Sequence, residues 1–143
     1  MGRKRRFGVS VSEGVAEALD RLAEVLNADR SSLVEDAIRV FIDDHLHYLV
    51  PHRCGGVMMI SGRVERGRLF KAIENNRDVV RSYTHTHVGG LCLETLIVEG
   101  PSSKIVKLHK ELLEIPGCRV RYMPITCIAE LLGKGFKRPR NLT

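Results

Sequence analysis

The 143-residue sequence contains no long hydrophobic run. No apolar stretch approaches the roughly 18 residues that a membrane-spanning helix requires. The basic N-terminus is not followed by the apolar core of a secretory signal peptide, so we expect a cytoplasmic protein without membrane contact. Four cysteines are present: Cys54, Cys92, Cys118 and Cys127. They could form two disulfides in a secreted protein, but nothing indicates export, and we expect reduced thiols.

The sequence also lacks the residue patterns of common enzymes. We find no Ser/His/Asp set, no paired carboxylates beside a candidate site, and no glycine-rich phosphate loop followed by Lys-Ser or Lys-Thr. These absences predict a protein that is not an enzyme. A metal-dependent enzyme is the remaining enzymatic alternative, because histidines and a cysteine can hold catalytic zinc.

Positive charge is concentrated at the two ends of the chain. The formal net charge is +6. The N-terminal cluster consists of Arg3, Lys4, Arg5 and Arg6, and the C-terminal cluster of Lys134, Lys137, Arg138 and Arg140. The C-terminal cluster is equally consistent with a solvated tail. The N-terminal cluster runs directly into a strand pattern, which favours nucleic-acid phosphate as its partner.

Residues 6–11 alternate as a β-strand does, with Phe7, Val9 and Val11 on one face. A strand this short is not stable alone and must pair with another. Ser12 is a plausible N-cap for the amphipathic helix that follows. The stretch 27–31 then breaks the helical pattern, and a second amphipathic helix begins. One strand and two helices cannot close a core alone, so the pattern predicts a dimer with paired strands.

This order of elements resembles the ribbon-helix-helix DNA-binding proteins. The resemblance implies that the paired strands enter the major groove, with Arg6, Gly8 and Ser10 facing the bases. It also implies that the start of the second helix, at Arg30 and Ser31, binds a phosphate through free amides. Gly8 has no side chain to read a base, which predicts a more shape-based specificity. The alternative is that residues 1–45 form only a dimerisation module.

Residues 46–56 lose clear periodicity, and Pro51 and Gly55-Gly56 interrupt regular structure. The sequence therefore predicts a ribbon-helix-helix domain, a linker, a second domain, and a short helix with a basic tail: residues 1–46, 47–56, 57–127 and 128–143. His45, His47, His52 and Cys54 lie at a helix end and in the predicted linker, where no single face is defined. Their role stays open.

The second domain is predicted to contain a strand, a helix, a two-stranded hairpin, a helix and a strand: residues 57–62, 66–75, 82–98, 102–113 and 118–123. This βαββαβ order favours a ferredoxin-like sandwich, and the whole chain is predicted to be α+β.

The hairpin carries the sharpest functional pattern. With Gly89-Gly90 as a two-residue turn, His87 faces Cys92 and His85 faces Glu94, so all four side chains share one side. Two imidazoles and a thiolate suit nickel, zinc, cobalt or copper, and Glu94 is placed to orient a ligand. The alternative is an ordinary histidine pair beside a small buried cysteine.

Together, the two domains and the pattern HTH…CLE resemble the nickel-responsive NikR repressors, over residues 6 to about 125. The resemblance implies an ACT-like second domain that assembles a tetramer and binds nickel at the subunit interface through His85, His87 and Cys92. Where that family has a cross-subunit histidine, this chain has Glu74-Asn75-Asn76. Glu74 from another subunit is thus the candidate fourth ligand, and zinc, cobalt or copper are alternative metals.

We therefore expect a metal-responsive repressor that binds a palindromic operator in double-stranded DNA. The alternative is a ribbon-helix-helix regulator without a functional nickel site, whose ACT-like domain senses a small molecule near Gly89-Gly90 and the helix start at Ser102.

Overall fold

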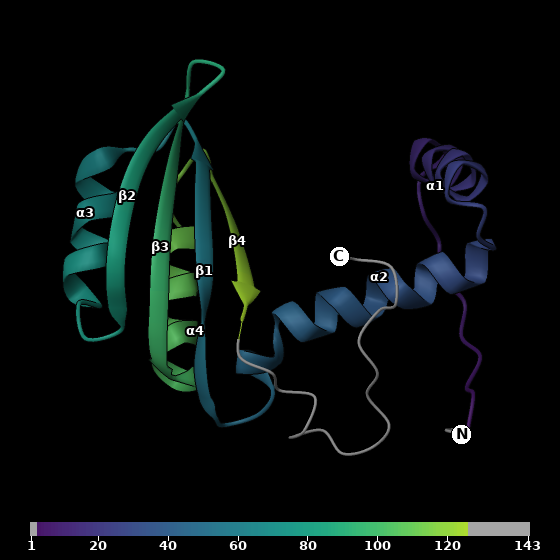
Figure 1. Cartoon of the computed structure of the whole chain (residues 1–143), viewed down its shortest axis with the longest axis horizontal. Coiled ribbons are helices and arrows are strands. Elements are labelled where there is room, and N and C mark those ends of the chain that lie inside the picture. The colour runs from purple at the N-terminus through teal and green to yellow at the C-terminus, as the bar shows by residue number, and fades with distance from the viewer. Residues whose placement is uncertain (1–2, 126–143) are drawn as a thin grey trace. The chain divides into compact units, whose positions relative to one another are not determined.

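The computed structural model describes residues 3–125 (Figure 1). The chain divides into two compact units, one extending to Ile42 and the other beginning at Asp43. Within the described range, no helix is long and apolar enough to cross a membrane. The predicted short helix and basic tail at 128–143 lie outside the described residues.

The N-terminal unit contains the two predicted helices, α1 (Glu13–Leu26) and most of α2 (Arg30–Asp44). The Ser12 hydroxyl caps α1 by accepting a hydrogen bond from the Val15 amide at 3.4 Å, which confirms the predicted N-cap. The helix ends at Asn27, whose left-handed backbone (φ 49°) is typical of a helix C-terminus.

The predicted strand at residues 6–11 has no regular secondary structure in the single chain. A β-ribbon needs a second strand, so the pairing of two chains stays a prediction. Neither α1 nor α2 contains a buried residue. The apolar side chains that remain exposed include Phe7, Val9, Val11, Val15, Leu22, Val25 and Phe41. Among its described residues, 3–42, one copy of this unit therefore has no hydrophobic core of its own.

The second unit contains the predicted βαββαβ order. Its elements are β1 (Arg53–Gly62), α3 (Arg66–Asn75), β2 (Val80–Val88), β3 (Leu91–Pro101), α4 (Ser102–Leu113) and β4 (Cys118–Pro124). The strands lie in the order β2-β3-β1-β4, and every neighbouring pair is antiparallel. This arrangement confirms the α+β, ferredoxin-like fold.

Both helices of this unit pack on one face of its sheet, with α4 behind β1 and β3 in Figure 1. The core between them contains the inward side chains of the strands and the apolar faces of the helices: Met58, Ile60, Leu96, Val98, Leu69, Ile105, Leu108 and Leu112. On the opposite face, Met59, Ile97 and Met123 are partly exposed. The two sheet faces therefore differ, and the metal-site candidates lie on the helix-covered one.

The region predicted as a linker, residues 47–56, is largely structured. A short 3-10 helix, η1 (Leu46–Tyr48), buries Leu46 and His47, and β1 begins at Arg53. Gly56 lies inside this strand, where a Cβ atom would stand 2.3 Å from the Met123 carbonyl oxygen. This glycine therefore permits a close strand approach rather than ending regular structure.

Candidate metal centre

The β2–β3 hairpin has the predicted register. Gly89 and Gly90 form the turn with φ of 57° and 78°, a backbone that two-residue hairpin turns require and that glycine adopts without strain. His87 pairs with Cys92, and His85 pairs with Glu94. The alternation of side chains along the strands then places these four residues on the same face of the hairpin.

Three potential ligand atoms, from His85, His87 and Cys92, lie within 4.8 Å of one another. Among residues 3–125, no other group of three or more His, Cys, Asp or Glu side chains is close enough to hold a metal. The two Nε2 atoms of His85 and His87 are 3.2 Å apart. Two nitrogens bound to one ion at about 2.0–2.1 Å would be roughly 3 Å apart, so this spacing fits shared coordination.

Glu94 is fully buried next to these residues, at 0% exposure. Its carboxylate accepts hydrogen bonds from Tyr83 Oη at 2.5 Å, from His85 Nδ1 at 2.6 Å and from Arg66 Nη1 at 2.9 Å. Burial acts to raise the pKa of Glu94, but the three hydrogen bonds outweigh it and hold the pKa below its usual value. Glu94 is therefore an ionised acceptor inside the fold.

The short contact from Glu94 fixes the tautomer of His85. Because His85 Nδ1 carries the proton donated to Glu94, its Nε2 presents a lone pair toward His87 and Cys92. Metal-binding histidines commonly have this arrangement, in which a carboxylate orients the ring and makes it more basic. The predicted orienting role of Glu94 is consistent with this geometry.

Two residues that hold Glu94, Tyr83 and Arg66, were not predicted from the sequence. Tyr83 lies two residues before His85 on β2, so strand periodicity could have placed it on the same face. Arg66 comes from the first turn of α3 and also contacts His85 Nδ1 at 3.1 Å. Its guanidinium lies 5.1 Å from the centre of the Phe70 ring. No local sequence signal links this helix to the hairpin.

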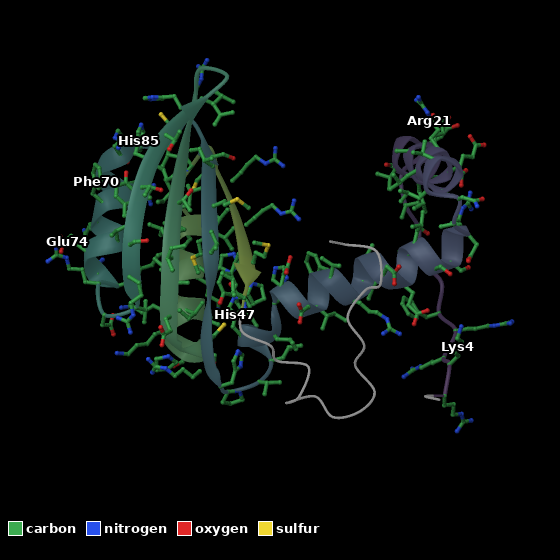
Figure 2. All side chains as sticks on the ribbon, in the orientation of Figure 1. Lys4, Arg21, His47, Phe70, Glu74 and His85 are labelled. Atoms are coloured by element: carbon green, nitrogen blue, oxygen red, sulfur yellow. The ribbon has the colours of Figure 1, made fainter. Side chains whose placement is uncertain are left out.

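Glu74 does not join the three ligand atoms within one chain. Its exposed carboxylate forms an ion pair with Arg77 at 3.2 Å near the end of α3. Figure 2 shows Glu74 well separated from His85. A ligand role for Glu74 therefore requires its contribution to the site of another subunit.

A separate group of histidines and tyrosines, with His47 and His109 buried, lies where η1 packs on α4. His109 Nδ1 lies 3.2 Å from His47 Nε2 and 3.0 Å from Tyr48 Oη. Burial lowers the pKa of His47 to about 3 and that of His109 to about 4, so both rings are neutral at pH 7. Nearby, Cys54 Sγ lies 2.7 Å from Tyr122 Oη. His47 and Cys54 are therefore buried residues with contacts inside the C-terminal unit.

The predicted DNA-contact residues lie in two places of the N-terminal unit. An exposed segment without regular secondary structure carries Arg3, Lys4, Arg5, Arg6, Gly8 and Ser10. Arg30 and Ser31 are exposed at the start of α2, where Arg30 Nε donates to Asp20 at 2.8 Å. One residue further along α2, the Ser32 amide donates to Asp29 Oδ1 at 3.0 Å, so it is already paired within the chain.

Comparisons with known proteins agree with this division of the chain. A family model described as "Ribbon-helix-helix protein, copG family" matches residues 5–44. A second, described as "NikR C terminal nickel binding domain", matches residues 66–123. The fold and the comparisons thus define the class: a regulator that joins a ribbon-helix-helix unit to an ACT-like unit.

Several curated relatives match nearly the whole chain. A protein of Geobacter sulfurreducens is 30% identical over 139 residues, covering 92% of this chain and 99% of the relative. A protein of Pelobacter propionicus is 30% identical, with 83% and 90% covered, and one of Methanocaldococcus jannaschii is 29% identical, with 80% and 86% covered. Each is named "Putative nickel-responsive regulator". The chain belongs to the family of nickel-responsive, ribbon-helix-helix regulators, which are not enzymes.

Proposed function

We propose that this metal-responsive regulator is a repressor that binds a palindromic DNA operator when the β2–β3 hairpin holds a metal ion. The observation that carries the proposal is the convergence of His85, His87 and Cys92 within 4.8 Å on one hairpin. Two imidazoles and one thiolate form a donor set for a borderline or soft transition metal.

Nickel is the metal that the names of the relatives favour. In each subunit, the two histidines and Cys92 supply three ligands, and Glu74 of a neighbouring subunit is the candidate for the fourth. An oxygen ligand suits zinc or cobalt better than square-planar nickel, so these metals and copper are the alternatives. When bound, the ion would link two subunits and so favour one arrangement of them.

The DNA-binding role is supported by the N-terminal unit. Arg3, Lys4 and Arg5 precede residues 6–11, which begin with Arg6, and the apolar face of this segment is exposed in one chain. Pairing of two such segments would bury Phe7, Val9 and Val11 and would present Arg6, Gly8 and Ser10 to the major groove. A two-fold dimer of this kind reads a palindromic site.

A tetramer would explain how the metal controls DNA affinity. The partly exposed sheet face with Met59, Ile97 and Met123 offers apolar surface for association of the C-terminal units. Metal binding changes DNA affinity only if the ion favours one arrangement of the subunits. Typical allosteric coupling of about 1–3 kcal/mol would tighten operator binding by about 5- to 150-fold.

A gel-shift titration with a palindromic operator tests the proposal. The wild-type protein should bind more tightly with nickel than with a chelator, whereas His87→Ala should bind equally weakly under both conditions. An Arg6→Ala variant should lose DNA affinity but retain its metal. Equal affinity of the wild type with nickel, zinc, cobalt, copper and chelator would refute metal control and leave the DNA-binding proposal intact.

A further inference from the structure

A pocket of about 720 Å³ lies in the C-terminal unit, away from the metal-site candidates. Residues 47–53, from η1 to the start of β1, form one wall. Pro101 and three residues from the start of α4, Ser102, Ser103 and Val106, contribute the rest. Its volume is in the range of small-molecule sites.

Two buried side-chain nitrogens without a hydrogen-bond partner belong to residues that line this pocket: His47 Nδ1 and His52 Nε2. Within residues 3–125, no other buried side-chain nitrogen or oxygen lacks a hydrogen-bond partner. His47 is 4% exposed, and its other nitrogen contacts His109. Unpaired buried polar atoms are rare in folded proteins, and their coincidence at one pocket points to a ligand.

His52 shows what kind of group it would bind. Its Nδ1 lies 2.6 Å from the Val50 carbonyl oxygen, to which only a protonated nitrogen can donate. In the neutral ring, Nε2 therefore carries a lone pair. The missing partner of His52 is a hydrogen-bond donor, such as an amino or hydroxyl group.

The start of α4, on the same pocket as His52, offers a site for an anionic group of the ligand. This 12-residue helix has Pro101 as its N-cap, no capping side chain, and no acidic residue in its first turn. The Ser102 amide donates to the His52 carbonyl oxygen at 2.8 Å. The next amides, of Ser103 and Lys104, have no intrahelical acceptor, and the helix dipole adds a partial positive charge there.

We propose that this pocket binds a small organic acid that carries a hydrogen-bond donor beside its carboxylate, such as an α-amino or α-hydroxy acid with an apolar side chain. The carboxylate accepts from the first-turn amides of α4, and the amino or hydroxyl group donates to His52 Nε2. The apolar side chain packs against Leu49, Val50 and Val106, which line the same pocket. This binding does not depend on the proposed metal site.

Calorimetric titration of the full-length protein tests the proposal, with the proteinogenic L-amino acids and matching α-hydroxy acids as probes. At least one probe should bind with a Kd in the micromolar to millimolar range. Ser103→Glu, which places a carboxylate at the start of α4, should weaken that binding by at least about tenfold. The uncharged control of the same size, Ser103→Gln, should bind within about threefold of the wild type.

A second variant tests the histidine. His52→Asn places an amide donor near the position of Nδ1 but removes Nε2, and it should weaken binding by about tenfold. Thermal unfolding separates these effects from loss of fold, because Ser103→Glu should unfold no earlier than Ser103→Gln. Metal titration should give the same metal affinity for all of these variants. The proposal is overturned if no probe binds the wild type at about 10 mM, or if either Ser103→Glu or His52→Asn binds as tightly as the wild type.

Discussion

Replacing Glu94 by glutamine should weaken metal binding without removing a ligand. The glutamine keeps the size of the side chain but loses the negative charge of the carboxylate. In the wild type, this carboxylate pairs with Arg66 and accepts a hydrogen bond from His85 Nδ1. An amide can also present its NH₂ group to His85, which would favour the tautomer with the proton on Nε2 and block the lone pair that a metal needs.

The structure sets the expected size of two effects of this substitution, one on metal affinity and one on the free energy of unfolding. Loss of a hydrogen-bonding partner behind a metal-binding histidine typically costs 10- to 100-fold in metal affinity, or about 1.4–2.7 kcal/mol. Glu94 is fully buried, but the Arg66 side chain is 44% exposed, so water can solvate the cation that loses its partner. The free energy of unfolding should therefore fall by about 1–3 kcal/mol, below the 3–5 kcal/mol typical of a broken, fully buried pair.

Metal affinity is best measured by competition with a chelating dye, and stability by urea unfolding of the metal-free protein. Glu99→Gln is the matched control on the same strand. Glu99 is 48% exposed and pairs with Arg53 at 3.1 Å, so its substitution should change metal affinity by less than about twofold and stability by less than about 1 kcal/mol. If Glu94→Gln binds metal as tightly as Glu99→Gln does, Glu94 does not orient a ligand.

Three further predictions concern the hairpin and the buried cluster. Gly90→Ala should cost about 1–2 kcal/mol in urea unfolding because residue 90 has φ 78°, and an unchanged midpoint would contradict the turn. Cys92→Ser should abolish the sulfur-to-cobalt charge-transfer absorption of the cobalt-loaded protein, whereas Cys118→Ser should keep it; the reverse result would exclude Cys92 as a ligand. Burial lowers the pKa of His109 from 6.5 to about 4, so the unfolded chain takes up a proton first as the pH falls. The free energy of unfolding should then drop by up to about 3 kcal/mol between pH 6.5 and 4. This drop should be smaller in His109→Leu. If the wild type and His109→Leu lose the same stability over this pH range, His109 is not its cause.

Much of the fold follows from short-range patterns in the sequence. Gly89-Gly90 between two alternating segments fixes the turn, and the turn fixes which residues of β2 and β3 face each other. Ser12 marks the start of α1 for a similarly local reason, since its hydroxyl satisfies an amide three residues later. Such features depend on neighbours within a few residues and are therefore readable from one sequence.

Features that depend on distant contacts could not be predicted. Gly55-Gly56 looks like a break in the sequence, but Gly56 lies in β1 because β4 approaches it closely, 67 residues later at Met123. The pairing of His47 with His109 spans 62 residues. Arg66 reaches Glu94 only because α3 packs beside the hairpin, and the spacing of these two residues along the chain gives no sign of it.

The most direct test of the central claim is the metal content of protein purified without an affinity tag and titrated with nickel, zinc, cobalt and copper. The wild type should bind about one equivalent of one of these metals per chain, and both His87→Ala and Cys92→Ala should lose it. A wild-type protein that binds none of these ions, or variants that bind them as tightly as the wild type, would contradict the assignment of these three side chains as a metal centre.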